Sequence, residues 1–149
     1  MTNLIAKWRL ILSGYLVVND KKEVLWLYKT KYEHYKTPGG KIELNDCKNP
    51  EKPTKTDLTK TAKRELFEEL GKDIKIKKLL YFGAVEFTIP DARLAAANKF
   101  ITKITSGIPR INEPEIFSKI EYLPIEHLEK YPISPDLKLL LSKFAKFYD

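Results

Sequence analysis

The sequence predicts an α+β fold, and three observations lead to this fold class. Segments rich in β-branched and aromatic residues open the chain, a helix with a clear start and stop lies in the middle, and an amphipathic segment ends it. No internal repeat is present. Because 149 residues suffice to bury a core without disulfides or a structural metal, we expect a single domain over 1–149.

The composition narrows the class of protein. A formal charge of +7 and a sequence pI near 9.3 favour anionic partners, but the lysines are scattered, so phosphorylated small molecules and nucleic acids both stay open. The single cysteine, Cys47, excludes an internal disulfide and a multi-cysteine zinc site, and it fits a reducing compartment. No apolar run approaches the roughly eighteen residues of a membrane span, and signal-peptide features are missing, so we expect a cytoplasmic protein without a membrane partner.

The predicted strands come first along the chain. Segments 8–18 and 24–30 are rich in leucine, β-branched and aromatic residues, and the polar turn 19–22 between them is typical of a hairpin. Further strands are predicted over 75–89, with a break at Gly83, and over 99–105 and 119–124.

Two helices follow from capping signals. The first is predicted over about 56–70, because Thr54 precedes Asp57 at capping-box spacing and Gly71 suits the left-handed residue that ends a helix. The second is predicted over 134–148, starting with Ser134 as N-cap. Its apolar stripe consists of Leu137, Leu140, Leu141, Phe144 and Phe147.

Three glutamates share one edge of the central helix. At 100° per residue, Glu65, Glu68 and Glu69 fall within an arc of about 100°. Like charges at this spacing cost roughly 0.2–0.5 kcal/mol per pair, which a bound divalent cation would offset. Arg64 and Lys72 each stand four residues from Glu68, so a solvated face stabilised by ion pairs is the alternative.

The segment upstream of the helix adds a second type of ligand. Pro38 is followed by Gly39 and Gly40, which adopt positive φ freely, so backbone carbonyls can turn toward a ligand. Carbonyl and carboxylate oxygens together are the donors that Mg²⁺ prefers. The two segments therefore favour a magnesium site between this loop and the helix.

These residues resemble the Nudix box, in which a glycine loop precedes a helix that ends Arg-Glu-x-x-Glu-Glu-x-Gly. The match is complete from Arg64 to Gly71. The front half departs from the pattern: Asp46 stands where a glutamate is usual, and an insertion of about ten residues, 47–56, separates it from the helix. The segment order of nearly the whole chain is similar to that of MutT-like Nudix hydrolases. The resemblance implies an α/β/α sandwich, with a mixed, twisted sheet between helices.

The resemblance also implies an activity and roles for the box residues. Nudix hydrolases cleave a phosphoanhydride of a nucleoside diphosphate linked to another group, with Mg²⁺ as cofactor and Mn²⁺ as its substitute. Glu65, Glu69 and the carbonyl of Gly39 would bind metal, and Glu68 would be a ligand or the general base. Arg64 would orient the carboxylates, with a surface ion pair as its alternative role. Glu68, Glu69 and Arg64 are thus the candidate catalytic residues.

Residues outside this set are weaker candidates. Lys41 would steer phosphates or pair with a carboxylate. Glu115 is the candidate for a metal ligand outside the box, with a solvated loop charge as the alternative, and Glu43 has similar standing. Tyr122 would stack on a base or belong to the core.

The substrate is less defined than the chemistry. Segment 112–128 is similar to a region of Nudix enzymes that act on nucleoside triphosphates, which implies release of nucleoside monophosphate and pyrophosphate. Hydrolysis of ADP-ribose or dinucleoside polyphosphates, and nucleotide or RNA binding without catalysis, stay open, as does a homodimer. His34 and His127 have no partner at triad or zinc spacing, so surface roles are expected for both.

Overall fold

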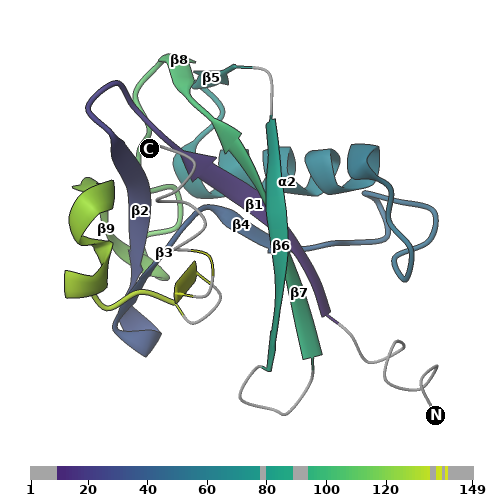
Figure 1. Ribbon diagram of the computed structural model, residues 1–149. Helices are drawn as coiled ribbons and strands as arrows, with labels where there is room; N and C mark the ends of the chain where they lie inside the picture. Colours follow the sequence, from purple (N-terminus) through teal and green to yellow (C-terminus); the bar gives the residue numbers. More distant parts are fainter. Residues whose placement is uncertain (1–9, 78–79, 89–93, 135–136, 139, 141–149) are drawn as a thin grey trace.

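The computed structural model describes residues 10–77, 80–88, 94–134, 137–138 and 140 (Figure 1). They form an α+β fold in which helix α2 lies against a mixed sheet, as predicted. The elements are β1 Leu10–Val17, β2 Glu23–Lys29, η1 Thr30–Tyr32, β3 His34–Lys36, β4 Gly39–Lys41, α2 Lys55–Leu70, β5 Lys75–Ile76, β6 Leu80–Thr88, β7 Leu94–Thr102, β8 Ile104–Ser106, β9 Phe117–Pro124 and η2 Ile125–Lys130.

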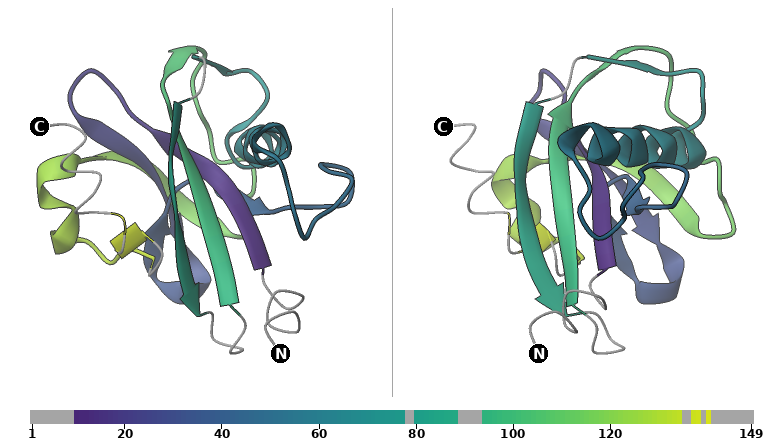
Figure 2. Two further views of the ribbon diagram at one scale, coloured as in Figure 1. Left: turned by 45° about the vertical axis from the view of Figure 1, so that its right-hand side comes forward. Right: turned by 90° about the vertical axis from the view of Figure 1, so that its right-hand side faces the viewer.

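The main sheet is mixed. Its order is β4-β1-β7-β6; β1 runs parallel to β7, whereas the outer pairs are antiparallel. A parallel pair needs a long crossover, and the chain between β1 and β7 includes helix α2. Strands β3-β2-β9 form an antiparallel sheet, and β5 pairs with β8. Figure 2 shows α2 crossing one face of the main sheet.

Only the turn of the predicted N-terminal hairpin is confirmed; the pairing of its two strands is wrong. Asn19 does form the turn, because its side-chain oxygen accepts hydrogen bonds from the backbone N–H groups of Lys21 and Glu23, each at 3.0 Å. Only one bridge, between Val18 and Val24, then joins the two strands. The strands part because β1 is already flanked by β4 and β7, and β2 by β3 and β9.

Two later strands differ from prediction in their limits. Gly83 does not break β6; it lies at a register shift of the β6–β7 ladder, consistent with a bulge. Strand β7 begins at Leu94, well before the predicted start at residue 99. Its first half consists largely of alanines, which have weak strand propensity but are buried here.

Helix α2 confirms the predicted helix within one residue. Thr54 is the N-cap, and its side chain and that of Asp57 each accept a hydrogen bond from the other's backbone N–H, at 3.1 and 2.9 Å. Gly71 ends the helix with φ of +97°, a region that favours glycine. Of the predicted insertion 47–56, residues 48–53 form turns without a helix or strand and most are exposed, whereas Cys47 is buried and residues 55–56 already belong to α2.

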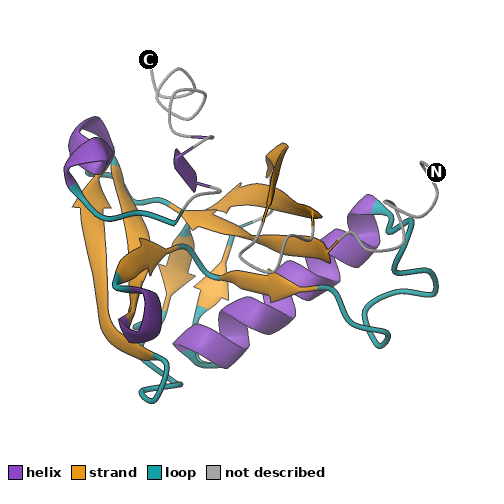
Figure 3. Cartoon of the chain, turned by 90° about the horizontal axis from the view of Figure 1, so that it is seen from below, coloured by secondary structure: helices purple, strands orange, loops and turns teal. Residues whose placement is uncertain are grey.

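The buried side chains form two clusters. One packs α2, through residues such as Leu66 and Leu70, against Tyr15 and Phe100 of the main sheet. The other surrounds Trp26. Figure 3 shows α2 on one side of the strands and η2 on the other. Leu137 of the predicted C-terminal helix is helical and buried in the second cluster, and Leu140 is also buried.

The remaining stripe residues of that helix, Leu141, Phe144 and Phe147, lie outside the described residues. Among the helices that the structure describes, none combines the length and apolar character needed to cross a bilayer.

Candidate active site

The predicted glycine loop is wrong: Gly39 and Gly40 begin strand β4 and pair with Gly14 and Ser13 of β1, while α2 packs against them. An added Cβ at Gly39 would lie 2.7 Å from the Cα of Gly14, and one at Gly14 would lie 2.2 Å from the carbonyl oxygen of Pro38. The backbone N–H of Tyr15 donates to that same carbonyl at 2.8 Å. A side chain at Gly14 or Gly39 would therefore push β4 away from β1.

Glu69 is the most deeply buried carboxylate of the predicted set, with a relative exposure of 2%. Its Oε1 accepts a hydrogen bond from the backbone N–H of Gly39 at 2.8 Å, and its Oε2 pairs with Lys36 Nζ at 3.3 Å. Burial raises the pKa of Glu69 to about 7, although Lys36 and the Gly39 N–H act in the opposite direction. A second cation beside this carboxylate would favour its charged form.

Glu65 lies one helical turn before Glu69 and also faces β4. A Cβ added to Gly40 would lie 2.4–2.6 Å from the three carboxyl atoms of Glu65, so the side chain packs directly on the glycine. Arg64 Nη1 donates to Glu65 Oε1 at 2.9 Å. Burial raises the pKa of Glu65 despite this contact. Both carboxylates therefore face β4, that of Glu69 buried and that of Glu65 half-buried.

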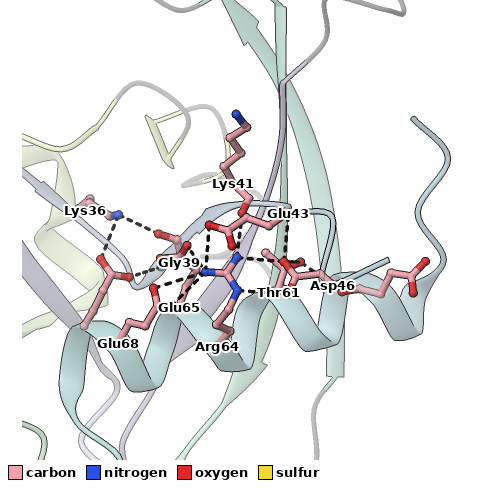
Figure 4. A network of polar contacts seen from close by, with 11 residues as sticks. Lys36, Gly39, Lys41, Glu43, Asp46, Thr61, Arg64, Glu65 and Glu68 are labelled. Atoms are coloured by element: carbon pink, nitrogen blue, oxygen red, sulfur yellow. Dashed lines mark hydrogen bonds and ion pairs between the residues drawn. The ribbon is translucent and has the colours of Figure 1, made fainter. Parts of the chain in front are cut away.

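Arg64 connects α2 to the end of β4 and to Asp46 beyond it (Figure 4). Its Nε and Nη2 donate to the two carboxylate oxygens of Asp46 at 3.1 and 2.9 Å, and Nη2 also donates to the Lys41 carbonyl at 3.0 Å. Nη1 contacts Glu65 and, at 3.3 Å, Glu68. Its hydrogen bonds to Asp46 raise the pKa of Arg64 further above its ordinary value. Arg64 thus contacts the carboxylates of Asp46, Glu65 and Glu68 at once.

Asp46 is buried and accepts further hydrogen bonds from Thr61 Oγ1 at 2.9 Å and from the Glu43 N–H at 3.0 Å. Burial alone would raise the pKa of Asp46, but the hydrogen bonds from Arg64, Glu43 and Thr61 hold it below its usual value. The residue is therefore an ionised anchor for Arg64.

The third box glutamate lies at the solvent side of the helix. The side chain of Glu68 is 51% exposed and contacts Arg64. Glu115 is also exposed, whereas Glu113 is half-buried. Burial raises the pKa of Glu113, and the charges of Glu68 and Glu115 add to this effect. Glu113 is therefore a carboxylate near Glu68 that the sequence analysis missed.

A cavity of about 660 Å³ opens beside Gly39 and Gly40. Three lysines line it, and Lys99 Nζ donates to Thr37 Oγ1 at 3.0 Å from a buried position. The lining residues of the cavity are Leu10, Leu12, Ser13, Lys29, Tyr32, His34, Lys36, Thr37, Gly39, Gly40, Phe87, Thr88, Lys99, Ser134 and Leu137. None of the predicted glutamates is a lining residue, but Lys36 and Gly39 contact Glu69, and Gly40 contacts Glu65. The cavity therefore offers positive charge and apolar surface, and it adjoins the two carboxylates through these three residues.

Two predicted substrate residues lie away from this cavity. The Lys41 side chain is exposed and points away from the glutamates in Figure 4, while its carbonyl binds Arg64. Tyr122 pairs with Leu25 in the β2–β9 ladder and packs against the first core cluster. His34 lines the cavity rather than the outer surface, and the side chain of His127 lies outside the described residues.

The donor atoms fit a hard cation, although the described residues contain no group of three or more histidine, cysteine, aspartate or glutamate side chains positioned for a metal. The fit comes from Glu65, Glu69 and a backbone carbonyl. The ammonium of Lys36 lies 3.0 Å from the Gly39 oxygen and 3.3 Å from Glu69, so this position already favours positive charge. Carbonyl and carboxylate oxygens are suitable ligands for Mg²⁺.

Comparisons with known proteins identify the family and the fold. The model of the NUDIX domain family matches residues 9–144. No curated protein matches the chain. Among solved structures, a MutT NUDIX hydrolase from Burkholderia pseudomallei is 20% identical with a TM-score of 0.73, and the alignment covers 90% of this chain and 96% of that one.

Two further structures are similar over most of their length. A MutT protein from Methanosarcina mazei Go1 is 18% identical with a TM-score of 0.71, covering 95% of this chain and 96% of that one. The NUDIX domain of Shewanella oneidensis NrtR, complexed with ADP ribose, is 15% identical with a TM-score of 0.68, covering 95% and 88%. The chain therefore belongs to the NUDIX domain family, and its fold is that of the MutT-like Nudix hydrolases.

Proposed function

We propose that this protein is a Mg²⁺-dependent pyrophosphohydrolase that cleaves a nucleoside triphosphate to nucleoside monophosphate and pyrophosphate. One observation carries the proposal: the carboxylates of buried Glu69 and half-buried Glu65 contact Gly39 and Gly40 of β4, and the same two glycines line a cavity that also contains three lysines. Buried carboxylates beside positive charge suit the binding of a cation together with a polyphosphate. The apolar part of the cavity suits the nucleoside.

We assign a role to each residue of the site from its burial and its contacts. Glu65, Glu69 and the Gly39 carbonyl would hold Mg²⁺, which when bound neutralises phosphate charge and lowers the pKa of a bound water. Glu68, half exposed at the edge of the site, is our candidate to accept the proton of the attacking water at its carboxylate. Arg64 holds Glu65 and Glu68 in place through its anchor on Asp46.

The lysines of the cavity would bind the negative charge of the substrate's phosphates. Lys29, Lys36 and Lys99 place three ammonium groups along its wall, and Lys41 is too far out to line it. Glu113 is a better candidate than Glu115 for an additional ligand, because it is half-buried and lies within electrostatic reach of Glu68. In a paired comparison, Glu113→Gln should lower kcat/KM more than Glu115→Gln; equal effects would remove Glu113 from the site.

The direct test is a nucleotide panel incubated with protein and Mg²⁺, analysed for nucleoside monophosphate. We expect turnover of a nucleoside triphosphate and none in excess EDTA. ADP-ribose belongs in the panel, because the similar NrtR domain was solved with that ligand. Binding of a nucleotide or RNA with no hydrolysis of any panel member would instead support a non-catalytic module.

The matched mutation is Glu69→Gln, which keeps the shape of the side chain and removes its charge. We expect kcat/KM to fall by about 10²–10³, roughly 2.7–4 kcal/mol of transition-state stabilisation. Glu51→Gln, the same change in the exposed loop, is the control and should have little effect. Full activity of a folded Glu69→Gln variant would contradict the site assignment.

A further inference from the structure

Lys36 occupies a particular place in the candidate site. Its Nζ lies 3.0 Å from the carbonyl oxygen of Gly39 and 3.3 Å from Oε2 of Glu69. These are two of the oxygens assigned above to the divalent cation. The same lysine lines the cavity assigned to the substrate. One ammonium group thus lies at the boundary between the cation ligands and the substrate cavity.

The side chain is held from more than one direction. Lys36 is the last residue of β3, and its Nζ lies 5.5 Å from the ring centroid of Phe117. The side chain is 23% exposed and therefore retains access to solvent on one side. Because a lysine stem has four rotatable carbons, its ammonium can move several ångströms while β3 stays in place.

An ammonium and a divalent cation compete for the same oxygens. Mg²⁺ binds oxygen at about 2.0–2.1 Å and demands near-octahedral geometry, so it leaves little room for a second cation on the same ligands. Two positive charges this close repel strongly in a partly buried site. A polyphosphate in the adjoining cavity would offer the displaced ammonium a new anionic partner.

We propose that Lys36 is a positioning residue that competes with the divalent cation for the Gly39 carbonyl and Glu69, and that the displaced ammonium then binds the substrate's phosphates. This inference rests on the proposed function. It adds that cation binding and substrate binding are coupled through one lysine, so each ligand strengthens the binding of the other. Without substrate, the protein holds its cation weakly.

The test measures Mg²⁺ affinity directly, by calorimetry without nucleotide, at about pH 8.5 so that the carboxylates are ionised. We expect Lys36→Met to bind Mg²⁺ about tenfold or more tightly than the wild type. Lys41→Met is the matched control: it removes the same charge from an exposed side chain nearby and should change the affinity by less than about twofold.

A second measurement adds a non-hydrolysable nucleotide. In the wild type it should tighten Mg²⁺ binding, and this gain should shrink in Lys36→Met because the released ammonium is missing. Lys36→Gln provides the same comparison if the methionine variant does not fold. Equal or weaker Mg²⁺ binding by a folded Lys36 variant overturns the inference.

The outcomes separate this inference from the proposed function. If the wild type binds Mg²⁺ and hydrolyses a nucleotide but neither Lys36 variant binds Mg²⁺ more tightly, only the competition by Lys36 is wrong. If the wild type binds no divalent cation with or without nucleotide, both proposals fail.

Discussion

Removing the carboxylate of Asp46 should destabilise the protein strongly, although an exposed loop follows this residue closely in the chain. Asp46 is buried, and its two oxygens accept hydrogen bonds from Arg64, Thr61 and the Glu43 N–H at 2.9–3.1 Å. The change Asp46→Ala leaves all of these donors without this acceptor. It also removes the contact that fixes the guanidinium of Arg64 beside Glu65.

The expected loss of stability depends on the contacts that Arg64 retains in Asp46→Ala. Breaking a fully buried ion pair costs about 3–5 kcal/mol because one charge is left uncompensated. Arg64 keeps its contacts with Glu65, Glu68 and the Lys41 carbonyl, so we take the lower end, about 3 kcal/mol. For a chain of this length, that loss lowers the melting temperature by roughly 6–12 °C.

Urea denaturation and thermal melting of Asp46→Ala measure this effect. The control is Glu43→Ala, because Glu43 approaches Arg64 only at 3.7 Å with a side chain that is 55% exposed. We expect that control to lose less than about 0.5 kcal/mol. A loss below about 1 kcal/mol for Asp46→Ala, or one equal to the control, would refute the anchoring role of Asp46.

Three further predictions concern the same region. Because the folded pKa of Asp46 lies below its unfolded value of about 3.9, the stability that its carboxylate contributes is present at neutral pH and is lost as the pH falls. Urea denaturation should therefore show the stability difference between wild type and Asp46→Asn shrinking below about pH 4. A constant difference down to about pH 2 would contradict this. Gly40→Ala should force the Glu65 carboxylate to move, so kcat should fall by about tenfold or more while the free energy of unfolding changes by less than about 1 kcal/mol; unchanged kcat would argue against Glu65 as a ligand. Replacing residues 48–53 by a short Gly-Ser link should keep kcat within about tenfold and raise KM mainly at low salt, as steady-state kinetics at two ionic strengths would show; a thousandfold loss of kcat would place catalytic groups in the loop.

Features set by neighbouring residues could be predicted from the sequence. The start of α2 depends on Thr54 and Asp57, three residues apart, and its end on Gly71, so the helix was predicted within one residue. Strand partners depend on the whole fold, and for that reason the separation of β1 from β2 was not predicted. The weak strand propensity of alanine hid the first half of β7.

The same distinction applies to the site. The three glutamates and the glycine loop are visible as a pattern, but nothing local marks Lys36 as their neighbour. It stands 33 residues from Glu69 in the chain and reaches it because β3 leads into β4, which packs on α2. Asp46 was noted as a departure from the box pattern. Its role as the partner of Arg64 needed the fold, because 18 residues separate the two.

The loop over 48–53 is fastened at both ends by contacts that do not involve the loop itself. On one side Asp46 is fixed by Arg64 and Cys47 is buried in the core, and on the other Thr54 caps α2. Doubling the length of such a segment costs only about 0.6 kcal/mol in closure entropy. A fluorescent reporter or an affinity tag inserted in this stretch should therefore leave the geometry of the site unchanged.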